Sequence, residues 1–499
     1  MGHLIVAAIA ATAYGSLVAL FAHRFFLQLL LPLLFLALLV IWVLPETRNA
    51  PRRLVHILFF GFLLGFVLWP DYLALALPGL PWITIRRIIS VPLAVTLLIC
   101  ISVSGEARRE IYAVLRATPL AAKLFLAFVF LQLLSIALSR NPALSVEKFI
   151  VAQLYWTTAF FAGCYVFARQ GTVARWAAIF CLMLIPLLIS GYWEWRNSQV
   201  PWAGRIPWFL VVEDEVVARI LSGAARAATG KYRVQGTSTT SLGFAEYLAM
   251  TTPFLIHYVV GAFRPAVRAA ALLVLPLVYL MIVATDSRLG MAGFLLSFVG
   301  YVGMWAAVQW RSDKRSLFGP ALSLGFPVIF ILFITATFQV PRLHRMVWGG
   351  GEHQASTDAR AEQYSQGFRL VARNPFGNGI GMGAETLGFR SGSDVLTIDT
   401  YYLLVALEYG VLGFLIYYGF LLVSAVKAGV TLLKAPSGNQ ETLYLIPLTL
   451  SLVIFIVIKS VFSVEANHPL IFMMLAAILA LIARSTPGGS QETLLRRVD

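Results

Sequence analysis

Two acidic residues in the C-terminal part of the chain have the type and position for acid–base chemistry. Asp399 stands two residues before an apolar segment that begins at Tyr401, and Glu408 follows nine residues later. A carboxylate beside a substrate hydroxyl can accept its proton as a general base, provided that its pKa suits the working pH. An aspartate just before a helix can instead cap the helix N-terminus. The sequence leaves both roles open for Asp399.

Three arginines lie in polar segments beside apolar runs, namely Arg233, Arg288 and Arg360. The planar guanidinium group carries five N–H donors, which suits it to bind phosphate oxygens. At a membrane surface such a side chain can also contact lipid headgroups or form a structural ion pair. Arg288 is the strongest candidate for phosphate binding, because it lies in a very short turn between two apolar runs.

A run of alternating glycines comprises Gly377, Gly379, Gly381 and Gly383. The spacing G-x-G-x-G-x-G differs from the G-x-G-x-x-G of a dinucleotide site, and no strand precedes it. Glycine lets a backbone approach a neighbour closely and adopt positive φ. The run therefore predicts a tight backbone passage near a ligand or another helix.

Metal ligands and disulfides are not indicated by the sequence. His344 and His353 are nine residues apart, which matches no metal-binding spacing. Cys100, Cys164 and Cys181 each lie inside an apolar run and are expected to be packing residues. We therefore expect neither a metal nor another cofactor.

The composition identifies the elements that must position these residues. The 499 residues are 59% apolar and 12% charged, with a mean hydropathy of +0.82. Soluble proteins contain about 25% charged residues, so this chain is expected to be a polytopic helical membrane protein. The net charge of +15 resides largely in short loops and forms no continuous basic face, which argues against a nucleic-acid partner.

Apolar windows of roughly 20 residues predict an all-α, polytopic membrane bundle of about 12–14 transmembrane helices. The segment 401–430 is long enough for a short amphipathic helix ahead of a span, with a kink or break at Gly410. The predicted spans are residues 4–22, 26–44, 55–77, 86–104, 121–138, 149–168, 174–192, 243–263, 269–285, 290–310, 317–339, 401–430, 443–461 and 468–483.

The basic residues of the short loops predict the orientation. If the spans alternate in direction, all of these loops lie on one side of the membrane. The positive-inside rule makes that side cytoplasmic, and both termini lie there too. The short basic loops are residues 47–53, 105–120, 169–175, 264–268, 311–315 and 427–434. The predicted regions are spans in 1–192, a long outer loop 193–242, spans in 243–339, a second outer loop 340–400, spans in 401–484 and a disordered tail 485–499.

Four motifs together resemble the O-antigen ligase and polysaccharide polymerase superfamily of bacterial envelope glycosyltransferases. The family has an outer arginine ahead of a span, which Arg233–Tyr247 resembles. It also has a Thr-x-Ser-Arg turn, which Thr285–Arg288 resembles. In the family an arginine is followed by an amphipathic helix and by Asn-Pro-x-Gly-x-Gly, and Arg360–Gly381 resembles this arrangement. A His-Asn-x-Tyr-Leu segment followed by Glu-x-Gly-x-x-Gly is similar to Asp399–Gly413. The resemblance covers roughly residues 230–430.

The resemblance implies a metal-independent, inverting glycosyltransferase of the bacterial inner membrane, with its active site facing the periplasm. Its donor would be a glycan on undecaprenyl pyrophosphate, and its acceptor a second lipid-linked glycan. Membrane lipids surround it, and a chain-length regulator is a further candidate partner. The three arginines would hold the pyrophosphate. Asp399 would act as the base, Glu408 would orient the site or serve as a second base, and Tyr401 and Tyr402 would offer aromatic faces to sugars.

One departure from the family pattern favours a polymerase. Ligases of the family carry a histidine at the position of Asp399, whereas related polymerases also accept an acid there. The alternative within the class is a ligase that transfers the glycan to lipid A core or another acceptor. The alternative of another class is a transporter or flippase for the lipid-linked glycan. A transporter would place charges near the membrane midplane, whereas the predicted spans here are nearly free of charge.

Overall fold

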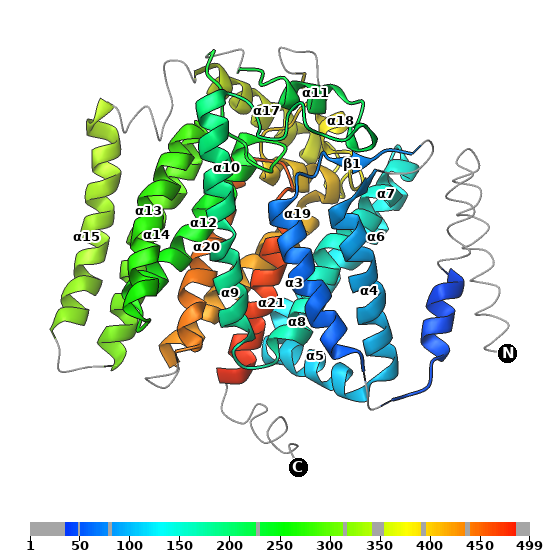
Figure 1. Cartoon of the computed structure of the whole chain (residues 1–499), viewed down its shortest axis with the longest axis horizontal. Coiled ribbons are helices and arrows are strands. Elements are labelled where there is room, and N and C mark those ends of the chain that lie inside the picture. The colour runs from blue at the N-terminus through cyan, green and yellow to red at the C-terminus, as the bar shows by residue number, and fades with distance from the viewer. Residues whose placement is uncertain are drawn as a thin grey trace.

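Helices form nearly all of the regular structure in the part of the chain that the computed structural model describes (Figure 1). The described residues are 35–47, 50–77, 82–225, 230–312, 317–341, 354–390, 396–434 and 440–485. The predicted span 4–22, His344, His353 and the predicted disordered tail beyond residue 485 lie outside them. A short hairpin pairs β1 (Ala74–Leu75) with antiparallel β2 (Ile83–Thr84).

Every predicted span from 55–77 onward coincides with a helix or a pair of consecutive helices. The single helices are α3 (Arg52–Leu68), α4 (Ile85–Val103), α6 (Pro119–Ser135), α12 (Ser241–Val260), α13 (Pro265–Ala284), α14 (Arg288–Ser312), α15 (Phe318–Gln339), α19 (Tyr401–Lys434), α20 (Leu445–Ile458) and α21 (His468–Ser485). Two spans combine α7 (Pro142–Ala152) with α8 (Thr158–Phe167), and α9 (Thr172–Leu182) with α10 (Leu184–Asn197). In the described residues, 8 helical segments are long and apolar enough to cross a membrane, which confirms the all-α membrane class.

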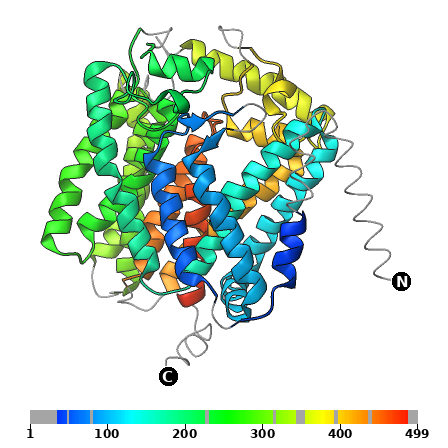
Figure 2. The same cartoon turned by 45° about the vertical axis from the view of Figure 1, so that its right-hand side comes forward.

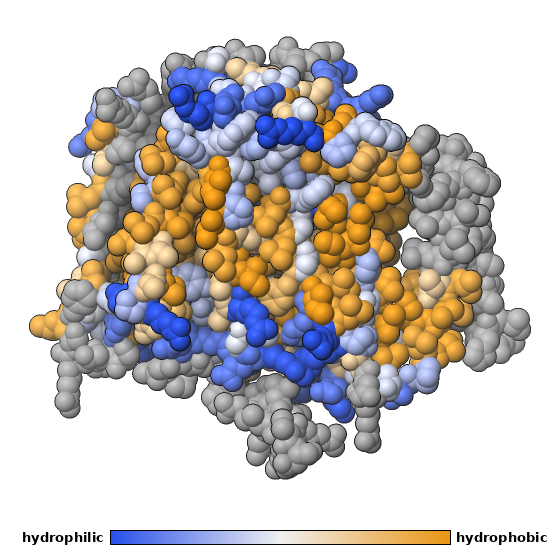
Figure 3. Space-filling view, in the orientation of Figure 1, coloured by the Kyte–Doolittle hydropathy of each residue, from blue (hydrophilic) through white to orange (hydrophobic). Residues whose placement is uncertain are grey.

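The spans alternate in direction, so the long connections gather at one end of the bundle. This loop-rich end carries α11 (Glu215–Leu221), α17 (Gln354–Arg373) and α18 (Gly383–Leu387). Figure 2 shows α17 lying across this end. A broad hydrophobic band separates it from the opposite hydrophilic end (Figure 3). The described short basic loops lie at that opposite end, as the alternation predicts.

The predicted loop 105–120 is wrong over most of its length, because residues Gly105–Ala117 form helix α5. Its N-terminus is capped by Ser104, whose hydroxyl accepts from the Ala107 amide. One face of α5 is buried through Ala107, Glu110, Ile111 and Val114, at helical spacing. Glu110 forms an ion pair of 2.7 Å with Arg52 at the start of α3. The segment is thus an amphipathic helix at the end of the bundle that carries the short basic loops, opposite the loop-rich end.

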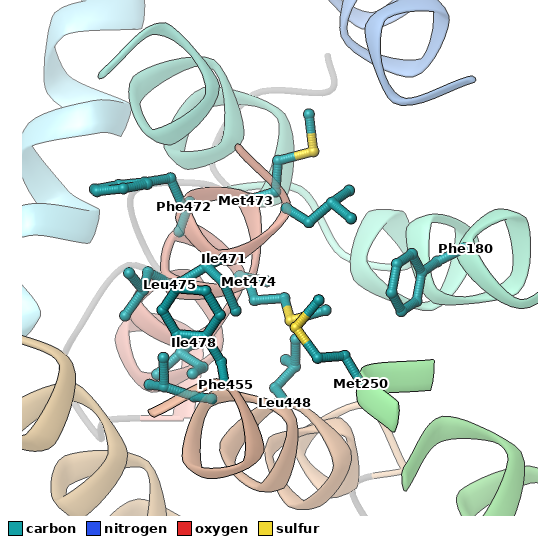
Figure 4. Packing of buried hydrophobic residues seen from close by; sticks show 14 of the residues in the cluster. Phe180, Met250, Leu448, Phe455, Ile471, Phe472, Met473, Met474, Leu475 and Ile478 are labelled. Atoms are coloured by element: carbon teal, nitrogen blue, oxygen red, sulfur yellow. The ribbon is translucent and has the colours of Figure 1, made fainter. Parts of the chain in front are cut away.

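The core of the bundle is built around α21, which is buried on nearly all sides. A helix that is apolar all round is stable only when other helices surround it. Figure 4 shows residues of α21 packed against α20, with α12 and α9 close by. The labelled α21 residues are Ile471, Phe472, Met473, Met474, Leu475 and Ile478. This packing fixes the positions of the surrounding helices relative to one another, and so fixes their ends at the loop-rich end of the bundle.

Candidate functional site

A cavity of about 420 Å³ lies at the loop-rich end, between the ends of several helices and the segments that connect them. We call this cavity the chamber. Small-molecule sites are typically about 300–1,000 Å³, so the chamber is of a size for a ligand. Among the described residues, its charged wall residues are Asp71, Arg86, Lys148, Glu408 and Glu465.

A local irregularity in one span supplies aromatic side chains to the chamber. Residues Gln153–Thr157 form a π-helical turn between α7 and α8. Such turns are rare and occur frequently at functional sites. Tyr155 and Trp156 of this turn line the chamber, and Trp156 also stacks on His468 with ring centroids 4.9 Å apart. The turn therefore places two rings beside the charged groups of the chamber wall, which also contains the rings of Phe66, Phe244 and Tyr247.

The break in α19 directs Glu408 into the chamber. Gly410 has φ 70° and ψ −173°, which ends regular helix at this point and confirms the predicted kink. A continuous helix would pair the Leu407 and Glu408 carbonyls with amides four residues later. Instead, the Asn378 amide donates to the Leu407 oxygen at 2.9 Å, and the Gly379 amide donates to the Glu408 oxygen at 3.0 Å. The glycine run thus forms a tight backbone passage against another helix, as predicted.

Replacing Gly410 with alanine is expected to break this junction. A non-glycine residue at such a φ and ψ costs about 1–3 kcal/mol, and the added Cβ would overlap the Pro375 carbonyl oxygen. We expect a lower apparent Tm in detergent and loss of any activity that depends on Glu408. Gly419→Ala is the matched control, since its Cβ would lie 3.7 Å from Leu124 in ordinary contact. Equal melting temperatures for the two variants would contradict this explanation of the break.

The carboxylates in the chamber wall are held by hydrogen bonds and by a nearby lysine. Glu408 is 4% exposed and accepts from the Gly383 amide at 3.3 Å. Glu465 is open to the chamber and accepts from the Tyr401 hydroxyl at 3.2 Å. Lys148 attracts both carboxylates electrostatically. These contacts orient two acidic groups and one ammonium group toward the same space.

A buried ion pair supports the loop that carries Glu465. Glu246 of α12 and Lys459 at the end of α20 are both 0% exposed, and their charged atoms are 3.0 Å apart. The Asn467 amide donates to Glu246 at 2.9 Å, and the Lys459 ammonium donates to the Val464 carbonyl at 2.7 Å. A buried charge pair needs such additional hydrogen bonds to offset desolvation. The spans therefore contain charges at the loop-rich end, contrary to the expectation that they are nearly free of charge.

Asp399 does not cap α19. The Thr400 hydroxyl performs that role by accepting from the Leu403 amide at 3.4 Å, so the predicted capping alternative is wrong. Asp399 is half-buried beneath α17, where its backbone amide donates to the Gln363 side chain at 2.9 Å. Burial raises the pKa of the Asp399 carboxyl, while attraction by Arg360 and hydrogen bonds act in the opposite direction. The carboxylate is thus available for a role other than capping.

The predicted phosphate-binding arginines fall into two groups at the loop-rich end. Arg233 donates to the carbonyl oxygens of Thr285 at 2.8 Å and Asp286 at 3.2 Å, and so holds the turn before Arg288. Arg360 on α17 faces Asp399. None of the three arginines, nor Asp399, is among the residues that line the chamber, whereas Glu408 is. The structure therefore separates the two predicted acids.

Residues 270–418 match the family model described as O-antigen ligase. This part of the chain, less than a third of its length, is similar to the O-antigen ligase family. This match confirms the predicted superfamily and indicates a membrane enzyme of the ligase and polymerase kind. No curated protein matches the chain.

The matched domain, residues 270–418, contains only part of the site. It runs from α13 into α19 and so includes Arg288, Arg360, Asp399 and Glu408. The chamber also requires side chains outside the domain, from α4, α7 and the connection between α20 and α21. The site is therefore assembled from both ends of the chain around the matched domain.

The two tyrosines at the start of α19 have structural contacts. Tyr401 is fully buried, and its hydroxyl contacts Glu465 as described above. The Tyr402 hydroxyl donates to the Ile456 carbonyl at 2.7 Å. Neither residue is among those that line the chamber, so their contact with sugars stays a prediction. Among the described residues, the aromatic rings that do line the chamber are those of Phe66, Tyr155, Trp156, Phe244 and Tyr247.

The residues Arg86, Lys148 and Glu465 of the chamber wall were not predicted from the sequence. Arg86 begins a predicted span, and the other two lie in or beside short connections that were assigned no role. Each was nevertheless placed by the alternating spans on the same face as the long loops. That common placement is the signal that would have found them, although their spacing in the chain does not indicate a shared cavity.

Proposed function

We propose that this protein is an inverting glycosyltransferase that extends a polysaccharide at the loop-rich end. The donor is a glycan linked to undecaprenyl pyrophosphate, and the acceptor is a sugar hydroxyl of a second lipid-linked glycan. One observation carries this proposal. A chamber with paired carboxylates and aromatic rings lies at the same end as the acid and the arginines of the matched domain.

The chamber suits the acceptor glycan better than the pyrophosphate. Carboxylates accept hydrogen bonds from sugar hydroxyls, and aromatic rings pack against the apolar faces of sugars. Three acidic and two basic side chains of the described residues line it, and Arg86 is engaged by Asp71 at 3.0 Å. This balance disfavours a multiply charged anion, because like charges repel strongly where water is limited. The pyrophosphate is therefore assigned to the arginines outside the chamber.

The reaction requires one base and a stabilised leaving group. The acceptor oxygen attacks the anomeric carbon from the face opposite the pyrophosphate, which inverts the configuration. Asp399 lies outside the chamber, so the reacting end of the acceptor extends beyond the chamber wall, where its proton passes to the Asp399 carboxylate while the C–O bond to phosphate breaks. The electron pair leaves with the lipid pyrophosphate, whose charge Arg288 and Arg360 stabilise as it develops. Arg233 holds the Arg288 turn and adds positive charge beside it.

The orientation of the bundle is consistent with this chemistry. The short basic loops lie opposite the loop-rich end, so the positive-inside rule directs the site toward the periplasm of a bacterial inner membrane. Nucleotide sugars are confined to the cytoplasm. A pyrophosphate-linked donor carries its own leaving group, so transfer can proceed on the outer face without them.

A ligase is the second candidate, and the description of the matching family favours it. Cells that lack this protein distinguish the two by the length of the glycan left on the lipid carrier. We expect single repeats to accumulate, because polymerisation is lost. Long lipid-linked polymer would instead indicate a ligase, and repeats retained on the cytoplasmic leaflet would indicate a transporter. Unchanged glycan length and attachment would overturn the proposal.

A further inference from the structure

The turn that follows α17, residues 374–377, presents an aromatic ring at the surface. Phe376 in this turn is 76% exposed. The turn itself is well fixed, because the Asn374 side-chain amide donates to the Gly377 carbonyl at 2.8 Å and to the Asn378 side-chain oxygen at 3.1 Å. The Gly377 amide also donates to the Asn374 carbonyl at 3.3 Å. A hydrogen-bonded backbone therefore holds the phenyl ring outside the core of the bundle.

This turn lies at the edge of a lipid-facing surface. The Val411 amide, directly after the break in α19, donates to the Pro375 carbonyl at 3.0 Å. From this point α19 continues as a membrane span, along which exposed apolar side chains recur at helical spacing. These side chains are Val411, Leu412, Leu415, Leu422 and Val426. They contact acyl chains in a membrane, so Phe376 adjoins a surface that lipid covers.

The last two turns of α17 place cations close to this ring. Arg369 and Arg373 are both exposed and are four residues apart, so they share one face of the helix. Among the residues that the structure describes, neither forms an ion pair with a carboxylate. Guanidinium groups bind phosphate oxygens well. An aromatic ring next to such arginines is typical of a segment in the membrane interface, with the ring among acyl chains and the cations at the headgroups.

We propose that the end of α17 is a lipid-binding anchor that prefers an anionic leaflet. Phe376 inserts among the acyl chains at the loop-rich end of the bundle, and Arg369 and Arg373 contact lipid phosphates there. The anchor bears on the site, because the two residues after the turn donate to the carbonyls at the break in α19. The membrane thereby steadies the junction that directs Glu408 into the chamber. Lipid binding at this turn does not depend on which reaction the protein performs.

Spin labels on single added cysteines measure the depth of the turn in the membrane. The full chain with Phe376→Cys would be reconstituted in vesicles of phosphatidylcholine, alone or mixed equally with phosphatidylglycerol. The accessibility of the label to oxygen, which partitions into lipid, is divided by its accessibility to a water-soluble nickel chelate. Leu412→Cys is the control within the span and Glu362→Cys the control in water, since both residues are exposed, on α19 and α17 respectively. The wild type, whose cysteines are buried or half-buried, gives the background labelling.

We expect the ratio at position 376 to be several-fold higher than at position 362 and close to that at position 412. Phosphatidylglycerol should raise it further. Adding Arg373→Gln to Phe376→Cys should remove this increase, whereas Arg196→Gln, at the exposed end of α10, should not. A ratio like that at position 362 would overturn the anchor. Low accessibility to both reagents would overturn it too, because protein would then cover the ring.

A second label position keeps the phenylalanine in place. Ala372→Cys reports on the same surface, since Ala372 is exposed in the last turn of α17. Adding Phe376→Ser should shift this label toward water, whereas Phe209→Ser, at another exposed phenylalanine of the loop-rich end, should leave it unchanged. An unchanged ratio in Phe376→Ser, or no effect of phosphatidylglycerol at either label position, would contradict the proposal.

Discussion

Replacing Asp399 with asparagine is expected to lower kcat by about 10²–10⁴-fold, the usual contribution of a general base. Asparagine keeps the shape of the side chain and cannot accept the hydroxyl proton. The fold should persist, because the helix is capped by Thr400 and asparagine keeps an oxygen that can accept the side-chain hydrogen bonds made at residue 399. Initial rates of glycan transfer in purified Asp399→Asn provide the measurement.

The pH dependence identifies the base. A base acts only when deprotonated, so kcat should fall as the pH drops through the pKa of Asp399. Burial raises that pKa, so the loss occurs at a higher pH than for an ordinary aspartate. Asp399→His should retain part of the activity and move this acidic limb upward, since histidine titrates near pH 6.5 in model peptides. A purely structural role for Asp399 would not move the limb.

Two further variants decide whether the effect belongs to this position. Asp358→Asn makes the same change at an exposed site on α17 and should leave kcat unaltered. Glu408→Gln should chiefly raise KM for the acceptor, because Glu408 lines the chamber. If Glu408→Gln removes the acidic limb while Asp399→Asn preserves it, then Glu408 is the base and the assignment of Asp399 is wrong.

The second large effect is expected at Arg288. Arg288→Ala should reduce kcat by about 10²–10³-fold, because it removes a donor that stabilises the departing pyrophosphate. The amount of protein in the membrane should be unchanged, because Arg288 is only partly buried at the first position of α14. Transfer rates and immunoblots of the membrane fraction check both parts of this prediction.

Arg288→Lys and Arg264→Ala are the controls for this effect. Lysine retains a positive charge and loses the planar pair of donors, so its rate should lie between those of alanine and the wild type. Arg264 is exposed at the opposite end of the bundle, and its replacement should have no effect on transfer. Full activity of Arg288→Ala would contradict the proposed arrangement of the leaving group.

Signals that are local in the sequence predicted most of the fold. An apolar window long enough to cross a membrane is a local property, and each described span was found in this way. The break at Gly410 was also predicted, because glycine favours a backbone that other residues avoid. Helix α5 was not predicted because it has few apolar residues and they lie on one face. A mean hydropathy over a window of residues does not detect such a pattern.

The chamber could not be predicted because it depends on contacts between distant parts of the chain. Lys148 and Glu465 are separated by most of the sequence, and only the packing around α21 brings them to one cavity. The π-helical turn that presents Trp156 also lies within an apolar run that reads as ordinary helix. Sequence motifs indicated the acid and the arginines, while the space for the acceptor emerged from tertiary structure.

Transfer by the purified protein in lipid vesicles tests the central claim most directly. The vesicles would contain undecaprenyl-pyrophosphate-linked repeats from the host and no nucleotide sugar, and the products would be separated by length. The account predicts a ladder of lengthened lipid-linked glycans that is absent with Asp399→Asn. Movement of the lipid-linked glycan across the vesicle membrane, with no transfer to any acceptor, would contradict it and identify a transporter.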